Sequence, residues 1–405
     1  MDYFYFFKRN TGILVIGFLL TFFSSLGQTF MISLYVPDLM KEMSLGKSTI
    51  GSIYGAATIL SSIALAYAGK FADTMDLRKY TIFTLILLSV SSAVTAFSNN
   101  IIFVFAGFWG LRLAGQGLLS HISSTAISKL FSKERGSALS ITSLGYAAGE
   151  MIFPITVGFM ILYSGWRFSM AANSIMTLLL IPILFIMMNK TNFHISKSSE
   201  GKNNEAQHFS RKELFRDTNF YIIAACSTVI PFIVTGLFFH QGALTQFKDW
   251  PVTLLASCMT GYAIARAVFT IAGGRLIDRF SAKVLLPVYL IVFAFALLIV
   301  TFFNSPVTAP IYLFLTGAAI GISSPVKTAV LAEYYGTENI GGIRSLFSTL
   351  MVLCTAVSPA LFGLILDSKM PFSYITGGSF LLVACCIICG YKLSLSDESF
   401  ADNRI

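Results

Sequence analysis

Three charged side chains interrupt apolar stretches in which charge is costly. Arg112 and Glu150 each lie about halfway along an apolar run in the first half of the chain, and Arg266 does so in the second half. A charge inside a bilayer is expensive unless it faces water or a partner, so it marks a candidate functional site. Arginine can bind an anion there, and a carboxylate can carry a proton. An Arg112–Glu150 ion pair would reduce the energetic cost of burying both charges. Glu150 could be part of a static ion pair or could carry protons, and the sequence favours neither interpretation.

Six further polar residues fall inside or at the ends of apolar runs, and each has a structural reading beside a functional one. Two neutral amides can line a solute cavity or bond to neighbouring helices. The two histidines can be proton sites or satisfied polar groups, and a lysine near one end can extend its amine to the cytoplasmic face. The set comprises Gln28, His121, Asn173, His240 with the adjacent Gln241, and Lys327.

The composition places these residues in a membrane protein. Of 405 residues, 55% are hydrophobic and 12% are charged, and the mean hydropathy is +0.76. Soluble domains carry about 25% charged residues. The first apolar run follows Lys8 and Arg9 but exceeds the ~7–15 residues of a signal h-region, so we expect a retained first helix.

Hydropathy predicts an all-α protein with about twelve transmembrane helices. The expected spans are Thr11–Leu34, Thr49–Ala68, Tyr80–Phe97, Ile101–Ile127, Gly136–Tyr163, Arg167–Met188, Asn219–Leu244, Val252–Leu276, Val284–Phe303, Ala309–Ala332, Gly342–Leu366 and Pro371–Leu393.

The basic residues predict the orientation of these spans. With a cytoplasmic N-terminus, 20 of the 28 Lys and Arg residues fall in inner segments, five in outer segments and three within the membrane. Positive charge collects on the cytoplasmic side, so we expect a multi-pass protein of the cell (inner) membrane with both termini in the cytoplasm. The net charge of +9 is then a topology signal and requires no nucleic-acid partner.

A half-length repeat predicts the domain organisation. The stretch Gly69–Lys79 returns as Gly274–Lys283, displaced by 205 residues, and Pro154 returns as Pro359. Such a repeat indicates two copies of one bundle. We therefore expect a six-helix bundle over residues 1–188, a polar cytoplasmic linker over 189–218 and a second six-helix bundle over 219–405.

The repeated stretches resemble a motif of the major facilitator superfamily. The matching residues are Gly69, Asp73 and Arg78 after the second span, and Gly274, Asp278 and Arg279 after the eighth. The resemblance covers nearly the whole chain. It implies two pseudo-symmetric six-helix bundles and a latch, in which these loops hold the outward-facing state. Thr74 stands where the family usually has Arg, which weakens the first latch relative to the second.

Two further segments are similar to motifs of that family. Residues 111–117 resemble its fourth-span motif, an Arg followed by Gly-rich turns, and 145–158 partly resemble the exporter-associated fifth-span motif without its Gly-Pro dipeptide. Import and export therefore both stay open. Arg266 resembles the eighth-span Arg that binds carboxylate in monocarboxylate and oxalate carriers, although it stands about one turn farther from Asp278 than expected.

Enzymatic function is disfavoured by what the sequence lacks. No nucleophile has a base nearby, and we find no His-rich metal pattern and no Walker loop for ATP. Cys385, Cys386 and Cys389 have no accompanying His or acid, so we interpret them as packing residues rather than a metal site. We expect no cofactor, and coupling must come from an ion gradient.

These observations predict a secondary active transporter that works by alternating access. Arg112, Arg266 and Lys327 outnumber Glu150 within the spans, which favours an anionic or zwitterionic solute with proton coupling through Glu150. The alternative is a proton-driven exporter of amphipathic compounds, such as a drug or siderophore, and a receptor with a transporter-like body is a third class. The family resemblance implies a monomer.

Overall fold

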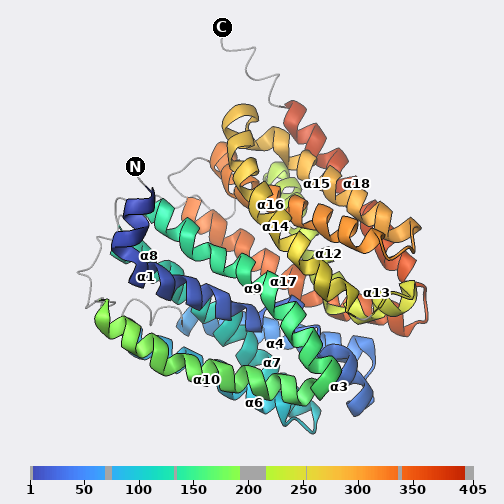
Figure 1. The fold of residues 1–405 in the computed structure, drawn as a ribbon. Coiled ribbons are helices and arrows are strands. Elements are labelled where there is room, and N and C mark those ends of the chain that lie inside the picture. Colours follow the sequence, from blue (N-terminus) through green and yellow to red (C-terminus); the bar gives the residue numbers. More distant parts are fainter. Residues whose placement is uncertain are drawn as a thin grey trace. The chain divides into compact units, whose positions relative to one another are not determined.

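The computed structural model describes residues 3–68, 75–131, 135–191, 216–251, 253–335 and 340–396, and these residues are helical with short connections (Figure 1). The chain forms two compact units, Met1–Gly201 and Lys202–Ile405. The first contains α1 (Tyr3–Ser24), η1 (Ser25–Gly27), α2 (Thr29–Ile32), α3 (Val36–Met43), α4 (Lys47–Ala68), α6 (Leu77–Ala96), α7 (Ile101–Leu111), η2 (Arg112–Leu119), α8 (Ser120–Leu130), α9 (Arg135–Ser164) and α10 (Trp166–Lys190). The second contains α12 (Thr218–Phe239), α13 (Gln241–Lys248), α14 (Leu254–Phe280), α15 (Ala282–Phe302), α16 (Thr308–Tyr335), α17 (Ile340–Asp367) and α18 (Phe372–Ser396).

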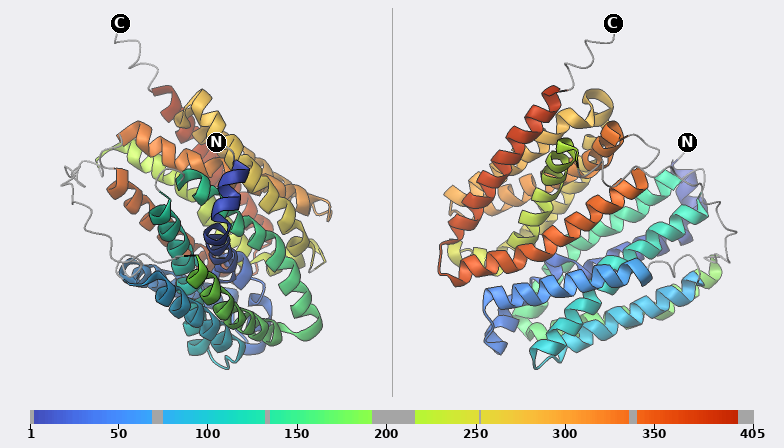
Figure 2. Two further views of the ribbon diagram at one scale, coloured as in Figure 1. Left: turned by 60° about the vertical axis from the view of Figure 1, so that its left-hand side comes forward. Right: turned by 180° about the vertical axis from the view of Figure 1, so that it is seen from behind.

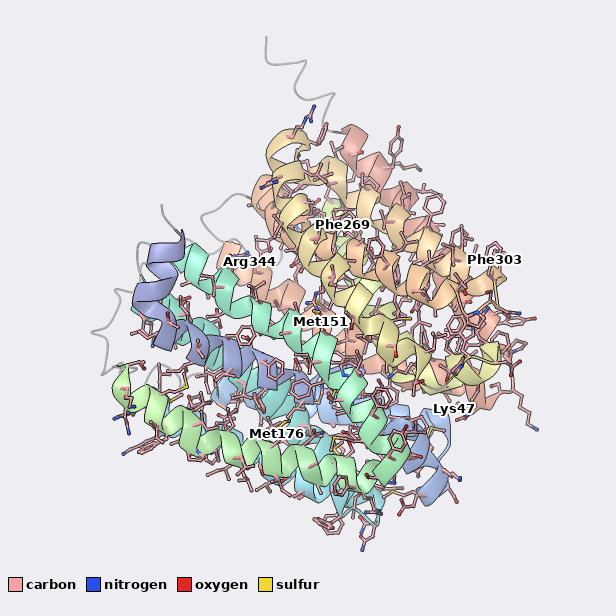
Figure 3. The ribbon with its side chains drawn as sticks, viewed as in Figure 1. Lys47, Met151, Met176, Phe269, Phe303 and Arg344 are labelled. Carbon is pink, nitrogen blue, oxygen red and sulfur yellow. The ribbon has the colours of Figure 1, made fainter. Side chains whose placement is uncertain are left out.

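Twelve helical segments of the described residues are long and apolar enough to cross a membrane. Their outward faces carry large apolar side chains, and Figure 3 shows such side chains projecting from the ribbons, with Phe303 among those labelled. A soluble protein rarely exposes so much apolar surface in one contiguous area. The chain is therefore a multi-pass membrane protein of all-helical fold, as the hydropathy predicts.

Small residues bring the helices of the N-terminal unit together. Helix α1 packs on α9, and α10 lies along α6 (Figure 2). A Cβ atom at Gly145 of α9 would overlap the backbone of α1 at Phe18, so only glycine permits this crossing. The Thr21 hydroxyl, on the same face of α1, donates to the Thr142 carbonyl at 2.6 Å. Close packing and interhelical hydrogen bonds thus replace the hydrophobic driving force that a bilayer does not supply.

Helices α14 and α16 form the most extensive contact of the C-terminal unit, again through glycines. A Cβ atom at Gly321 would lie 2.6 Å from the carbonyl oxygen of Arg266, and one at Gly317 would overlap the carbonyl of Tyr262. Gly317 and Gly321 are one turn apart on α16, so the two backbones touch along a smooth face. This contact positions Arg266 against α16.

The sequence repeat reappears in backbone detail. The short helices α3 and α13 begin and end at positions that differ by 205 residues. Each is followed by a residue in the left-handed conformation, Ser44 (φ 52°) and Asp249 (φ 53°). Left-handed residues are uncommon outside glycine, so a shared one at equivalent positions reflects a common local fold.

Two of the expected spans are interrupted in the structure. The first predicted span breaks at Ser25–Gln28, where a short 3-10 turn leads into Gln28 in extended conformation (φ −81°, ψ 156°). The seventh ends at Phe239, and His240 separates α12 from α13. Hydropathy does not detect the first break, because the residues on both sides of it are apolar. At the other end of the first unit, α10 runs to Lys190, two residues past the predicted boundary.

Candidate functional site

Arg112 is buried in the N-terminal unit, and backbone and aromatic groups surround it. Only 4% of its surface is exposed. One guanidinium nitrogen, Nη1, lies 3.4 Å from the Gly27 carbonyl oxygen, and the guanidinium carbon lies 5.1 Å from the centre of the Tyr54 ring. Its Nε atom is buried without a hydrogen-bond partner. Burying a charge with so few partners costs several kcal/mol, so this position is exceptional.

Tyr54 holds the guanidinium from α4. It is fully buried, its hydroxyl lies 2.7 Å from the Thr29 hydroxyl, and its ring packs edge-to-face on Phe108. A cation over an aromatic face gains roughly 0.5–2 kcal/mol, with the higher values in desolvated sites. The sequence analysis missed Tyr54, because a tyrosine in an apolar run has the pattern of an ordinary core residue.

The break in the first span supplies the carbonyl that Arg112 contacts. In an unbroken helix, the Gly27 carbonyl would accept the N–H of Met31. Here the Met31 N–H donates to the Gln28 carbonyl at 3.1 Å, which releases Gly27. Gln28, a predicted solute-binding residue, is half-buried and is the residue at which the helix direction changes. A role for its side chain in binding stays a prediction.

Gly27 and Gly115 form a backbone contact between the broken first span and the fourth. A Cβ atom at Gly115 would lie 2.7 Å from both Cα and N of Gly27, and one at Gly27 would overlap the Leu111 carbonyl. Gly115 belongs to η2, a π-helical segment that starts at Arg112. Segments of π-helix inside α-helices are rare and frequently mark functional sites. Two irregular segments therefore meet at the buried charge.

Glu150 lies on α9 and is also buried, with 6% of its surface exposed. The preceding residue, Gly149, leaves the space that the Ser25 side chain of η1 fills. Gly149 therefore faces the helix break, and Glu150 is the next residue along α9. The contacts of Arg112 described above are with Gly27 and Tyr54, and its pairing with Glu150 stays a prediction.

Arg266 and Lys327 bring two positive charges close together in the C-terminal unit. They lie on the contacting helices α14 and α16, and both are half-buried. The membrane spans of this unit carry carboxylates only at their ends, Glu333 and Asp367. Two like charges within an apolar bundle repel each other, so the pair is suited to an anion.

His240 joins two helices of the C-terminal unit. Its side chain is buried, and Nε2 lies 2.8 Å from the Pro359 carbonyl oxygen of α17. A carbonyl only accepts hydrogen bonds, so Nε2 carries the proton in this bond. This contact agrees with the structural reading of His240, while a proton-transfer role stays a prediction. Gln241 begins α13 and His121 lies in α8, and both are half-buried.

Asn173 belongs to a buried polar cluster at one end of the N-terminal unit. Its amide Nδ2 donates to the Tyr35 hydroxyl at 2.8 Å, and that hydroxyl lies 3.1 Å from the Ser169 hydroxyl. These bonds tie α10 to the segment before α3. The contact favours the structural alternative for Asn173, a bond between neighbouring helices, over solute binding.

The structure describes only part of the predicted latch. Gly69 and Asp73 lie outside the described residues, and so does the side chain of Asp278. Arg78 forms an ion pair with Asp76 at 3.0 Å and donates to Asn189 at 2.8 Å, and Asp76 caps α6. The sequence analysis missed this cap.

In the second latch copy, Gly273 makes the close approach to α16. A Cβ at Gly273 would lie 3.1 Å from the Cα of Ile322, whereas one at Gly274 would meet open space. Arg279 lies over the Phe280 ring at the end of α14. The latch function of both copies stays a prediction.

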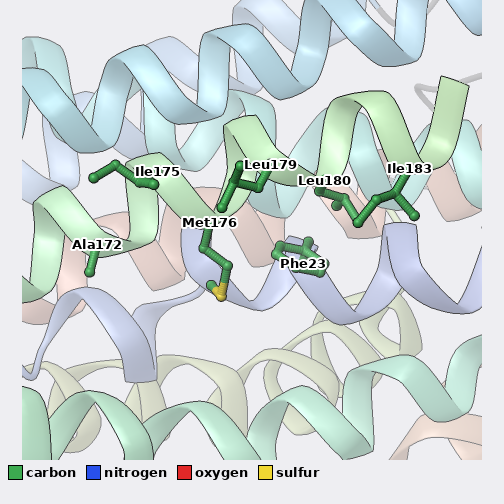
Figure 4. A pocket seen from close by; sticks show the side chains of 7 residues that line it. All are labelled: Phe23, Ala172, Ile175, Met176, Leu179, Leu180 and Ile183. Atoms are coloured by element: carbon green, nitrogen blue, oxygen red, sulfur yellow. The ribbon is translucent and has the colours of Figure 1, made fainter.

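Two cavities open on the N-terminal unit. An apolar groove of about 440 Å³ lies between α1 and α10 (Figure 4), where Phe23 faces Met176 and Leu180. A second cavity of about 530 Å³ lies beside Glu42, Asn100 and Arg167. Within the described part of the chain, no group of three or more His, Cys, Asp or Glu residues could hold a metal ion.

Comparison with known proteins identifies the family. The family model described as Major Facilitator Superfamily matches residues 17–257 and 232–401. The chain belongs to the Major Facilitator Superfamily. This finding confirms the family and the fold that the motifs and the repeat predict, and the membership is one of transporters rather than enzymes.

Similar members of the Major Facilitator Superfamily differ in what their names say they carry. Multidrug resistance protein 2 of Bacillus subtilis (strain 168) is 22% identical over 379 residues, which cover 90% of this chain and 91% of that protein. A probable hexose phosphate transport protein of Chlamydia pneumoniae is 26% identical over 162 residues, 40% of this chain and 34% of that protein. The gallate transporter of Pseudomonas putida is 22% identical over 178 residues, 44% of this chain and 39% of that protein.

Solved structures of the superfamily share the fold. A bacterial homolog of the human lysosomal transporter Spinster has a TM-score of 0.73 at 14% identity and covers 98% of both chains. The nucleoside transporter NupG has a TM-score of 0.71 at 12% identity, with 97% of this chain and 98% of that chain covered. At these identities the likeness concerns the fold alone.

Proposed function

We propose that this transporter carries a small organic anion or zwitterion by alternating access, with proton coupling through Glu150. The observation that supports the solute class is the pair of half-buried basic residues, Arg266 and Lys327, on contacting helices of the C-terminal unit. An anion between them would relieve their repulsion, and it would gain charge-assisted hydrogen bonds. The proposal includes Arg112 as a further solute-binding and proton-coupling residue, with Gln28, His240 and Gln241 as candidate lining.

The cellular setting of the proposal follows from the charge distribution. Both termini lie in the cytoplasm, in the cell (inner) membrane, because basic residues gather in the segments on that side. The protein works as a monomer of two bundles, joined by the linker over residues 189–218. The loops around Arg78 and Arg279 act as the latch of one conformational state.

A ligand-stability experiment tests the solute class. A ligand that binds only the folded protein stabilises it by about 2.7 kcal/mol at one hundred times its Kd. We expect carboxylates or phosphate monoesters to raise the melting temperature of the purified protein. Arg266→Gln and Lys327→Gln should abolish that rise, whereas Arg275→Gln, an exposed arginine on the same helix, should preserve it. Stabilisation that persists in both site variants would contradict the proposal.

A second candidate is a proton-driven exporter of amphipathic compounds. The supporting observation is that the relative aligned over 90% of this chain bears the name of a multidrug resistance protein. Expression in a drug-sensitive host separates the two candidates. Protection from lipophilic cations, without anion-dependent stabilisation of the purified protein, would favour export.

A further inference from the structure

The N-terminal unit holds a set of buried polar atoms that bond to nothing in the structure. Native proteins leave few such atoms, and each one calls for a partner such as water or an ion. Among the described residues of this unit, the atoms are Ser25 Oγ, Thr58 Oγ1, Trp109 Nε1, Arg112 Nε and Ser120 Oγ. Two of them, Trp109 Nε1 and Arg112 Nε, can only donate hydrogen bonds.

Three of these side chains belong to the elements around the Arg112 guanidinium. Trp109 precedes Arg112 by one helical turn. Thr58 follows Tyr54 by one turn on the same face of α4, and the Tyr54 ring covers the guanidinium. Ser25 lies two residues before Gly27, whose carbonyl Arg112 contacts. The unsatisfied donors and hydroxyls thus lie on the helical segments that carry or contact one buried charge.

The spans around Arg112 offer it no carboxylate. The segments Asn10–Gly27, Lys47–Ala68, Leu77–Ala96 and Ile101–Leu130 contain neither Asp nor Glu. Glu150, on α9, is the one acidic residue in the membrane spans of this unit. Water could satisfy the free donors, but it would leave the positive charge without compensation in an apolar bundle.

We propose that Arg112 is the centre of a binding site for a small monovalent anion, a halide or a single carboxylate group, formed by the N-terminal unit alone. Arg112 Nε–H and the hydroxyls of Ser25 and Thr58 supply the donors. Tyr54 is a positioning residue, because its ring covers one face of the planar guanidinium and leaves the N–H groups at the edge available. The inference rests on the proposed function and deepens it, because Arg112 is already among the proposed solute-binding residues and the inference names the chemical group that it binds.

Bromide is the probe for this site. The melting temperature of the purified protein is measured in sodium bromide and in sodium sulfate of equal ionic strength, since sulfate is divalent, and bromide is located by its anomalous scattering in crystals. We expect a saturable rise in bromide alone and a bromide peak beside Arg112 Nε. Losing one hydrogen bond to a charged group costs roughly 1.5 kcal/mol or more, so Thr58→Val and Ser25→Ala should each weaken bromide binding about tenfold.

Control variants separate a site from a general salt effect. Thr84→Val removes a buried hydroxyl that is already bonded to the Tyr80 carbonyl of its own helix, and it should leave the bromide affinity unchanged. Arg112→Gln should abolish the response. If that variant does not fold, the bromide affinities of Thr58→Val and Ser25→Ala are compared with that of Thr84→Val, and this comparison tests the inference. Equal bromide responses in all variants, or a peak elsewhere in the protein, would overturn the inference.

The source of the anion is distinguished by competition. If acetate displaces bromide, the site accepts a carboxylate and can receive the acid group of a solute. If chloride displaces bromide and acetate does not, the site holds an inorganic ion. Either result supports the anion site at Arg112. Neither result depends on which ligands bind at Arg266 and Lys327.

Discussion

Arg167 and Lys248 cap equivalent helix ends in the two repeats, although the two residues lie in non-equivalent helices. Arg167, at the start of α10, donates to the carbonyls of Ala96 and Ser98 at the end of α6. Lys248, at the end of α13, donates from Nζ to the carbonyls of Thr301 and Phe303 at the end of α15, at 3.5 and 3.1 Å. The second pair of acceptors lies 205 residues after the first. The repeats thus preserve the helix end that needs a cation, while the residue that supplies it has changed.

Removing either cation should destabilise the protein. Cations at a helix C-terminus and charge-assisted hydrogen bonds are each worth on the order of 1–2 kcal/mol when partly buried. Arg167→Met and Lys248→Met should therefore each lower the free energy of unfolding by about 1–2 kcal/mol in detergent. Lys41→Met, an exposed lysine of α3, is the control and should change it little. Equal stability of all three variants would show that these helix ends need no cation.

Acid should weaken the Arg167 cluster through Glu42. The hydrogen bond from Arg167 lowers the pKa of the Glu42 carboxyl below its ordinary value of 4.5. A group with a lowered pKa stabilises the folded state above its unfolded pKa and loses that effect as the pH falls through its folded pKa. The difference in melting temperature between wild type and Glu42→Gln should therefore be constant from neutrality to about pH 5. At lower pH it should fall towards zero. A difference that grows below pH 4 would contradict this sign.

The sequence could predict the spans and the repeat because both depend on composition along the chain. Apolar length identifies the helices, and the 205-residue displacement identifies the halves. The break at Gly27 and the π-helical segment at Gly115 could not be predicted, because they depend on backbone contacts between distant segments. Lys248 looked like an ordinary loop charge, and Tyr54 like a core aromatic. Their roles depend on which carbonyl or guanidinium the fold brings to them.

A methyl group at Gly115 should disrupt the contact between the two irregular segments. The added Cβ would lie 2.7 Å from backbone atoms of Gly27, which cannot move away as a side chain can. Overpacking of this kind costs roughly 1–3 kcal/mol. Gly115→Ala should lower the free energy of unfolding by that amount and reduce transport. Gly377→Ala is the matched control, because its Cβ meets open space, and alanine there should be neutral or stabilising by up to about 1 kcal/mol.

The polar cluster of Asn173 should matter for stability and little for solute affinity. Tyr35→Phe removes the hydroxyl that accepts from Asn173 and leaves its buried amide unsatisfied. Such a loss costs about 1–3 kcal/mol. Unfolding and transport measured on the same preparation should show a lower melting temperature with an unchanged KM. Tyr67→Phe, an exposed tyrosine of α4, should alter neither quantity. A raised KM in Tyr35→Phe would return Asn173 to the solute site.

Glu150 can be tested as the proton carrier by separating two modes of transport. Accumulation against a gradient requires a proton to cross with the solute, whereas exchange of labelled for unlabelled solute does not. Glu150 is buried in α9, and glutamine keeps its shape while it removes the exchangeable charge. We expect Glu150→Gln in proteoliposomes to lose pH-driven accumulation at least about tenfold, a barrier change of about 1.4 kcal/mol, and to retain exchange.

Glu150→Asp should restore part of the accumulation, since a carboxyl group is present again. Accumulation by Glu150→Gln at the wild-type rate would exclude Glu150 as the carrier, and loss of both modes in a folded variant would assign it to solute binding or packing instead.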